Sequence, residues 1–440
     1  MLDPELFQGF NSRAMTTKET LELLRAHESR NVLFTEADGS WPIVWERAEG
    51  VHVWDAEGKR YLDLTAAFGV AAAGHANPAV VRAGQAQMGK LLHAMGDVHP
   101  HAPKALLAKE LSGLTFERWE QQPGKVIYGS SGFEAVEAAL KTARLATGKR
   151  GVIVFEGGYH GLGYGALNAT HRELFRGPFK NQLREFGRFV PYPTKTMDLA
   201  RVEFEVRRQA RRERIGAVLV EPVQARGGIR IPPVEFLQFL RKWCDETGAL
   251  LILDEIYTGF GRTGKWFACE HSGVVPDVIC LGKALTGGFP LSACVGRAAV
   301  MDRAWPASQG EAIHTSTFLG HPVGCAMALA QIGELRRLKL PARSAELGAY
   351  WLKLAKEELP NLKLNLEIRG LGLMAGVEWR QPDGKPATAE ALQAVKTMLH
   401  RGFILLPEGE HGNIISFTPP LTITKAQLKS AVRALAEVCQ

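Results

Sequence analysis

Residues 251–288 read LILDEIYTGFGRTGKWFACEHSGVVPDVICLGKALTGG, and this stretch decides the fold of the chain. It holds two short runs that are apolar throughout, and these runs begin at Leu251 and Val278. Continuous apolar runs, unlike alternating ones, are typical of parallel strands that are covered on both faces. Asp254 follows the first run and Lys283 follows the second. Because ligands bind at the carboxyl ends of such strands, these two side chains are candidates for a functional site.

The rest of the central chain extends this pattern. From about residue 125, short apolar runs alternate with helical segments, which predicts an α/β fold with a mostly parallel sheet. The expected strands are 125–129, 151–157, 215–222, 249–255, 278–283 and 293–296, and the clearest expected helices are 134–147 and 233–247.

The two ends of the chain have a different pattern of expected strands and helices. Residues 41–65 predict short strands joined by turns, and residues 362–378 are also strand-rich. A long helical region is expected over 325–358 and an amphipathic helix over 425–438. We therefore expect a large domain over residues 71–325 and a smaller α/β domain built from residues 1–70 and 326–440.

Composition excludes several classes of protein. The 440 residues are 46% hydrophobic and 22% charged, which excludes a disordered chain and a disulfide-stapled miniprotein. No apolar run is long enough to span a membrane. The N-terminal residues carry several acids and no apolar signal core, which predicts a cytoplasmic protein.

Charge and cysteine usage point away from nucleic acid and from metals. The net charge is +7, but the one dense basic run, residues 207–214, is mixed with acids and is typical of a solvated helix face. The six cysteines form no CxxC pair, and Cys280 and Cys294 lie in apolar runs. We expect buried, reduced thiols, no metal site and no nucleic-acid partner.

A serine-rich turn follows the expected strand at residues 125–128. Gly129-Ser130-Ser131-Gly132 leads directly into a helical segment, so its backbone amides and hydroxyls could hold a phosphate at the helix N-terminus. A serine that only caps the helix explains the same residues equally well, and the sequence leaves both interpretations open.

Two other motifs resemble nucleotide-binding signatures without fulfilling them. Asp254 and Glu255 could bind a metal beside a phosphate loop, but the chain has no GxxxxGK[ST] sequence. Residues 259–264, GFGRTG, match GxGxxG, yet the strand ends five residues earlier and no convincing helix follows. We expect this loop to shape the wall of a pocket instead.

Lys283 is unusual for a lysine. It stands at the end of an apolar strand and within a glycine-rich loop. Burial disfavours the charged ammonium and lowers its pKa, which makes the amine a nucleophile suited to a Schiff base.

Taken together, these motifs resemble those of the class III (fold type I) pyridoxal-phosphate aminotransferases. The resemblance runs from about Trp41 to the C-terminus, and its most specific part is the order DEI, GFGRTG, PDV, GK and GG within residues 254–288. It implies a fold type I structure, pyridoxal 5'-phosphate as cofactor, and transfer of an amino group from a small-molecule donor to an oxo acid.

The resemblance also implies the roles of the residues around the cofactor ring. Lys283 is expected to bind the cofactor covalently and then to shuttle a proton. Asp254 is expected to keep the pyridine nitrogen protonated, so that the ring accepts electrons. In residues 221–224, EPVQ, the family places Glu221 near the ring and Gln224 near its 3-hydroxyl group.

The resemblance also implies which residues contact the cofactor phosphate and the face of its ring. The phosphate is expected at Ser131, Gly132 and Phe133. Tyr159 is expected to stack on the ring, with His160 beside it.

One expected contact comes from a second subunit. Thr317, in residues 315–318, matches the threonine that reaches the cofactor phosphate of the neighbouring subunit, which implies a homodimer with shared active sites. His321 stands where the family usually has Asn, a departure that the sequence does not explain.

Two other functions compete with transamination. A pyridoxal-phosphate isomerase, either an aminomutase or an amino-acid racemase, is possible on this fold, but aminomutases usually lack the complete GFGRTG loop. A non-catalytic cofactor-binding protein is disfavoured because Lys283 and Asp254 are both present.

The substrate prediction rests on Ser416. Relatives that are specific for ornithine, acetylornithine or 4-aminobutyrate typically carry an arginine at this place in a segment like IIRFxPP, whereas this chain reads IISFTPP. We therefore expect an ω-transaminase that takes amines or ω-amino compounds as donors, with pyruvate or 2-oxoglutarate as acceptor. Arg226, Arg262 or Arg369 could replace the missing arginine, and the sequence does not decide among them.

Overall fold

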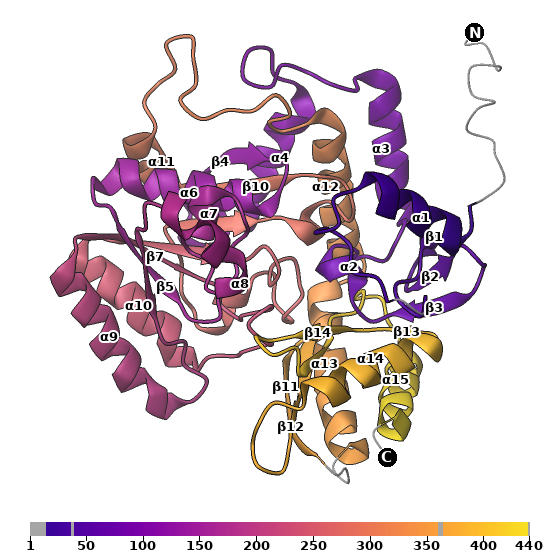
Figure 1. The fold of residues 1–440 in the computed structure, drawn as a ribbon. Coiled ribbons are helices and arrows are strands. Elements are labelled where there is room, and N and C mark those ends of the chain that lie inside the picture. The colour runs from indigo at the N-terminus through magenta and orange to yellow at the C-terminus, as the bar shows by residue number, and fades with distance from the viewer. Residues whose placement is uncertain (1–14, 37–38, 360–363, 439–440) are drawn as a thin grey trace.

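A computed structural model describes residues 15–36, 39–359 and 364–438 (Figure 1). Its centre is a seven-stranded sheet that is parallel except for β10, which runs antiparallel to both of its neighbours. The strand order is β4 (Gly124–Gly129), β10 (Ser292–Arg297), β9 (Val278–Leu281), β8 (Leu250–Asp254), β7 (Ile215–Val220), β5 (Gly151–Phe155) and β6 (Gly187–Val190). The predicted α/β fold with a mostly parallel sheet is confirmed.

The strands are apolar throughout because both faces of the sheet are covered. In β8, Leu251 and Leu253 belong to the hydrophobic cluster that contains Phe236 of α10 (Val234–Thr247). Ile252 points to the other face and belongs to the cluster that contains Val136 of α6 (Gly132–Thr147). Each such side chain contributes about 1.5–3 kcal/mol when it leaves water.

The two ends of the chain share a second sheet. In this four-stranded sheet, β13 (Phe403–Ile404) pairs in parallel with β3 (Arg60–Asp63), so the N- and C-terminal segments lie side by side (Figure 1). The other two strands are β1 (Trp45–Glu49) and β2 (His52–Asp55). The domain boundaries at residues 70 and 325 stay predictions.

A third sheet and several helices complete the C-terminal part. The sheet has the order β11 (Asn365–Leu371), β12 (Met374–Arg380), β15 (Ile414–Phe417) and β14 (Leu406–Glu408). Helices α14 (Thr388–His400) and α15 (Lys425–Val438) follow in this region, and the second matches the predicted terminal helix.

The remaining helices surround these sheets. They are α1 (Thr17–His27), α2 (Ala66–Gly69), α3 (Pro78–Lys90), α4 (Ala102–Leu114), α5 (Phe116–Glu120), α7 (Tyr164–Leu167), α8 (Glu173–Arg176), α9 (Leu199–Arg212) and α11 (Ala298–Ala304).

Two expectations about elements were wrong in part. The single helical region predicted over 325–358 is two helices, α12 (Pro322–Arg337) and α13 (Leu340–Glu358). They are separated because Lys339 adopts the left-handed conformation, with φ 50°, and Pro341 starts a new helix. Strand β6 was not predicted, since it is short and only partly buried at the edge of the sheet. In the strand-rich segment, residues 362 and 363 lie outside the described residues.

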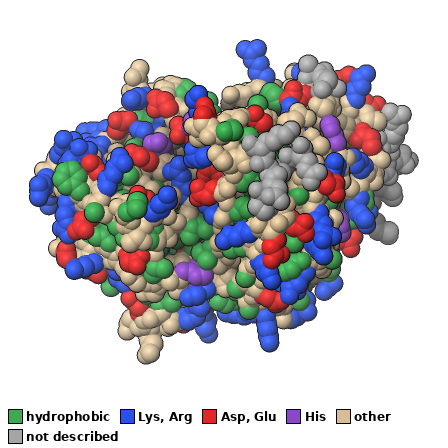
Figure 2. Space-filling model, turned by 90° about the horizontal axis from the view of Figure 1, so that it is seen from below, with side chains coloured by type: hydrophobic (Ala, Val, Ile, Leu, Met, Phe, Trp, Pro, Cys, Tyr) green, Lys and Arg blue, Asp and Glu red, His purple; other side chains and the backbone are tan. Residues whose placement is uncertain are grey.

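The surface of the molecule agrees with the interpretation of the basic run at residues 207–214 as a solvated helix face. Arg207 and Glu203 pair on the exposed face of α9 at 2.9 Å, and positive and negative side chains are interspersed over the face in Figure 2. Cysteines 244, 269, 280, 294 and 325 are buried and free, while Cys439 lies outside the described residues. Within the described ranges, no helix combines the length and apolarity needed to cross a bilayer, and no group of His, Cys, Asp and Glu could hold a metal ion.

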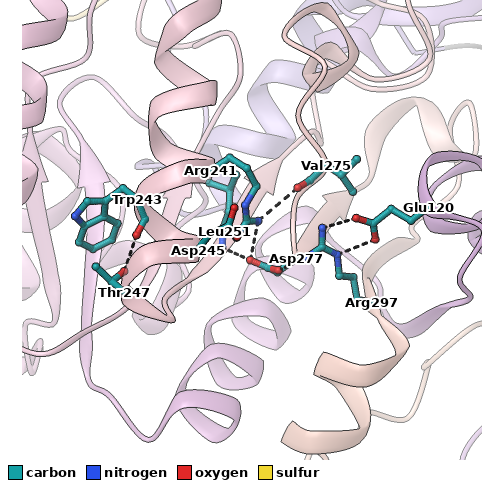
Figure 3. Close-up of polar contacts among 9 residues, drawn as sticks. All are labelled: Glu120, Arg241, Trp243, Asp245, Thr247, Leu251, Val275, Asp277 and Arg297. Atoms are coloured by element: carbon teal, nitrogen blue, oxygen red, sulfur yellow. Dashed lines mark hydrogen bonds and ion pairs between the residues drawn. The ribbon is translucent and has the colours of Figure 1, made fainter.

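Asp277, from the PDV part of the signature, ties together the amino end of β9 and its neighbours (Figure 3). Its Oδ2 atom accepts a hydrogen bond from the Leu251 amide at 2.7 Å and from Arg241 Nη1 at 2.9 Å. Its Oδ1 atom accepts from Arg297 Nη1 at 2.8 Å. This buried carboxylate therefore fixes β8 against β9, the two strands that carry Asp254 and Lys283 at their other ends.

We expect Asp277→Ala to lower the free energy of unfolding by about 3 kcal/mol, because it removes the side-chain acceptor of the Leu251 amide and takes one partner each from the largely buried Arg241 and from Arg297. Urea or thermal denaturation of the purified protein measures the loss. Asp245→Ala is the matched control, since Asp245 is exposed and pairs with the same Arg241, so its loss should stay below about 1 kcal/mol. Equal losses in the two variants would contradict this account of Asp277.

Candidate active site

A cavity of about 380 Å³ opens at the carboxyl ends of four neighbouring strands. Tyr159 and His160 follow β5, Glu221 follows β7, Asp254 ends β8 and Lys283 follows β9. The complete lining is Gly132, Phe133, Tyr159, His160, Gly161, Leu162, Glu221, Ala225, Arg226, Asp254, Ile256, Tyr257 and Lys283. Most of the residues singled out in the sequence thus meet in one place.

Lys283 lies in the floor of this cavity. Its Nζ atom is 4.5 Å from the centroid of the Tyr257 ring. Burial lowers the pKa of the Lys283 amine, and the negative charges of Asp254 and Glu221 offset part of that effect. Its backbone is in the left-handed region, with φ 43°, which a lysine adopts at a cost of about 1 kcal/mol. The surrounding structure therefore holds a nucleophilic amine in a fixed place.

Asp254 and His160 form a buried pair. The Nδ1 atom of His160 lies 2.7 Å from Asp254 Oδ2, and the other carboxylate oxygen accepts from the Ile256 amide at 3.1 Å. Because an ionised carboxylate can only accept, Nδ1 carries the hydrogen. Burial alone would lower the pKa of His160, but its hydrogen bond to Asp254 and the charge of that group outweigh burial and raise the pKa. His160 thereby orients the Asp254 carboxylate.

Glu221 is a second buried acid in the lining. It accepts hydrogen bonds from the amides of Tyr159, at 3.0 Å, and Ala225, at 3.1 Å. Burial raises the pKa of Glu221 to about 7, the charge of Asp254 adds to the rise, and His160 opposes it. Glu221 can therefore change its charge near neutral pH.

The N-terminus of α6 offers a place for an anion. Ser131 occupies the N-cap position, yet its hydroxyl forms no capping bond and is buried without a partner in the part of the chain that the structure describes. A Cβ atom at Gly132 would lie 3.1 Å from the Ile256 side chain, so a larger residue there would press on the cavity lining. An unused hydroxyl beside free helix amides fits a phosphate better than a simple helix cap.

Gln224 presents a second unused polar atom. Its amide nitrogen donates to the Glu156 carbonyl at 2.9 Å, whereas Oε1 is buried and has no partner among the described residues. Such an oxygen accepts a hydrogen bond from a hydroxyl group, but Gln224 is not among the residues that line the cavity.

Some motif residues lie outside the cavity lining. Thr317 is exposed, as a residue that reaches a neighbouring subunit would be. The GFGRTG loop does not form a pocket wall, contrary to expectation. Its Arg262 is buried and donates to the carbonyls of Leu373 and Pro419, so the loop joins the central part of the chain to the C-terminal part.

Glu255 and Ser416 do not line the cavity, and both side chains form hydrogen bonds within the protein. The carboxylate of Glu255 accepts from the amides of Ala268, at 2.9 Å, and Cys269, at 2.8 Å, so its role is structural. Ser416 is buried in β15, and its hydroxyl donates to the Leu406 carbonyl at 3.1 Å. This hydroxyl is therefore already engaged by the neighbouring strand.

Sequence reasoning missed five of the lining residues: Gly161, Leu162, Ala225, Ile256 and Tyr257. Ile256 and Tyr257 follow Asp254 and Glu255 directly, but Ile256 was only a letter of the DEI motif and Tyr257 was not singled out. Their place two and three residues after a functional strand end was the signal that could have identified them.

Comparisons with known proteins agree with this geometry. The family model described as "Aminotransferase class-III" matches residues 34–439. The chain is 38% identical to an acetylornithine aminotransferase from Methanosarcina acetivorans, over 90% of this chain and 92% of that protein. It is 36% identical to a putrescine aminotransferase from Pectobacterium atrosepticum, over 91% of this chain and 83% of that protein.

A solved structure extends the likeness to three dimensions. An amine transaminase from an uncultivated Pseudomonas species, described as pyridoxal-phosphate-bound, superimposes with a TM-score of 0.84 and 28% identity. The match covers 94% of this chain and 99% of that one.

Proposed function

Because the chain belongs to the class III aminotransferases and is a pyridoxal-phosphate-dependent transaminase of fold type I, we propose that its amino donor is a simple amine or an ω-amino compound. The observation that carries this proposal is Ser416, a buried serine bonded to its neighbouring strand where an arginine would receive a donor carboxylate. An arginine offers two charge-assisted hydrogen bonds of fixed geometry, and serine offers one neutral bond at most.

The acids around the cavity support the same proposal. Glu221 lines the cavity, and the buried Glu408 lies close enough to Lys283 for their charges to interact. With no arginine at residue 416, these acids favour an ammonium group over a second donor carboxylate, except where the guanidinium of Arg226 lines the cavity. The putrescine aminotransferase among the relatives acts on a donor of that kind.

We propose that the residues predicted from the sequence hold the cofactor. Ser131, Gly132 and Phe133 would bind its phosphate, Tyr159 its ring face, and Gln224 its hydroxyl group. When bound, the cofactor supplies an aldehyde that takes up the amino group and a ring that accepts electrons from the substrate.

Two residues would carry out the chemistry itself. Lys283 would attach the cofactor through its amine. Once the donor has released this amine, it would take a proton from the carbon that bears the donor's amino group and return it to the carbon that comes from the cofactor aldehyde. Asp254, oriented by His160, would hold a proton on the ring nitrogen. The relatives are named aminotransferases, which favours transamination over the isomerase alternative.

We also propose a homodimer in a cytoplasmic location. Residues 91–98 and 313–318 expose apolar side chains, including Met95, Val98 and Phe318, and Thr315 Oγ1 joins the two segments through Asp97 at 2.6 Å. A second copy of the chain would cover this surface, and Thr317 would then reach the partner's phosphate site.

The donor proposal is tested by the first half-reaction, followed spectroscopically on the purified holoenzyme. We expect 1-phenylethylamine and putrescine, which carry no carboxylate, to react faster than glutamate, with 4-aminobutyrate as the comparison that has a carboxylate but no α-carboxylate. A donor carboxylate that must lie near Ser416 loses about 1.5–3 kcal/mol of binding, which corresponds to roughly ten- to a hundredfold. Glutamate reacting far faster than every donor without an α-carboxylate would overturn the proposal.

A further inference from the structure

The structure separates the three arginines that could bind an acceptor carboxylate. Arg262 is buried and donates to two backbone carbonyls. Arg369 is held by Glu378 at 2.8 Å and by the carbonyls of Gly228 and Ile229. Arg226 alone among the arginines of the described chain lines the cavity that contains Lys283.

The backbone of Arg226 is fixed at the tip of a tight hairpin. Gln224 and Arg230 exchange two backbone hydrogen bonds of 3.0 Å, and the Gly228 amide donates to the Ala225 carbonyl at 2.9 Å. From the other side, Arg172 Nη2 donates to the carbonyl of Arg226 at 2.8 Å. The Cα atom of Arg226 is therefore well positioned at the cavity.

The side chain of Arg226, by contrast, has few restraints. It is 40% exposed, and its guanidinium carbon lies 4.9 Å from the centroid of the Tyr159 ring, a cation–π contact. Its nearest charged partner is Glu408, but Nε and Oε2 are 3.9 Å apart, too far for a hydrogen bond. Within the described residues, the Nε atom is buried without a hydrogen-bond partner. The guanidinium thus lies at the cavity with N–H groups that are available to donate hydrogen bonds to a ligand.

Glu408 is the counter-charge of this arginine. It is 8% exposed, burial raises its pKa, and Arg226, Arg172 and Lys283 oppose that rise. A pair held at 3.9 Å keeps Arg226 near the cavity without saturating its donors, so an incoming carboxylate can replace Glu408 as its partner.

We propose that Arg226 binds the carboxylate of the oxo-acid acceptor, and that Glu408 competes with the acceptor for Arg226. When no carboxylate occupies Arg226, the distal ammonium of a diamine donor competes with Arg226 for Glu408. This inference rests on the proposed function, because it assigns the acceptor and donor ends of the same site. One cavity thereby serves an anionic acceptor and a cationic donor in alternating half-reactions.

The test uses the second half-reaction of the aminated holoenzyme, with pyruvate and 2-oxoglutarate compared with propanal, an acceptor that has no carboxylate. We expect Arg226→Gln to weaken the apparent affinity for the two oxo acids by about ten- to a hundredfold, and to do so much more than for propanal. Calorimetric titration with glutarate, which does not react, should show the same weakening without any turnover.

Two further variants keep the proposal falsifiable. Arg226→Lys keeps the charge but loses the bidentate geometry, so we expect an intermediate loss. Glu408→Gln should strengthen glutarate binding and weaken the reaction with putrescine. Arg207→Gln, which removes the same charge from the exposed face of α9, is the matched control and should stay within about twofold of the parent protein.

Several outcomes would overturn the inference. One is an equal loss of apparent affinity for the oxo acids and for propanal in Arg226→Gln, and another is unchanged glutarate binding in that variant. A third is a Glu408→Gln variant in which glutarate binding and the reaction with putrescine both strengthen or both weaken. Failure of the donor proposal shows separately, since it is measured on the unsubstituted enzyme in the first half-reaction.

Discussion

Lys283→Ala should reduce transamination by roughly a thousandfold or more, because it removes both the nucleophile that holds the cofactor and the base that moves the proton. Burial lowers the pKa of this amine, which prepares it for the chemistry. Steady-state turnover with an amine donor and pyruvate measures the loss. Some cofactor should still bind through the residues at the N-terminus of α6.

The matched control for this substitution is Lys265→Ala. Lys265 lies in the same stretch of sequence but is exposed, and its amine only donates to the Glu270 carbonyl. We expect its turnover to stay within about twofold of the parent protein, as is usual for exposed polar contacts. Ordinary activity in Lys283→Ala, or an equal loss in both variants, would contradict the role assigned to Lys283.

Asp254→Asn should slow the first half-reaction by orders of magnitude and weaken cofactor binding. The substitution keeps the shape of the side chain and an oxygen that can accept from His160 Nδ1, which lies 2.7 Å from Asp254 Oδ2. It removes the negative charge, so a charge-assisted hydrogen bond of about 1.5–3 kcal/mol is lost, together with the stabilisation of the protonated ring. Single-turnover absorbance and cofactor titration measure the two effects.

Asp277→Asn is an informative comparison for Asp254→Asn. Asp277 is also a buried acid of the signature, but it lies at the amino end of β9 and does not line the cavity. We expect its substitution to lower stability while the single-turnover rate falls far less than in Asp254→Asn. A near-normal rate constant in Asp254→Asn would refute the role of its charge.

The sequence was most informative where one physical constraint acts on each position. A strand buried on both faces must be apolar throughout, so β8 and β9 were recognised with errors of one or two residues at their ends. Parallel strands place their carboxyl ends at one edge of the sheet, which is why Asp254 and Lys283 could be expected to lie close together. Both line the same cavity.

The sequence was least informative where contacts join distant segments. Arg226 and Glu408 form an ion pair because the hairpin after β7 packs beside β14. No local sequence pattern predicts a contact between segments so far apart in the chain. The GFGRTG loop was misplaced for the same reason, since its partners come from the C-terminal part of the chain. The break between α12 and α13 depends on one left-handed residue, Lys339, which helix propensity does not reveal.

Peptide mapping after borohydride reduction tests the central claim, that Lys283 in the strand-end cavity attaches the cofactor, most directly. Trypsin cannot cleave after a modified lysine, so the account predicts one cofactor-bearing peptide that spans residues 266–297 with Lys283 uncleaved. The unreduced protein, stripped of cofactor, should instead give peptides 266–283 and 284–297. A cofactor adduct on any other lysine, or no adduct in a protein that transaminates, would contradict the account.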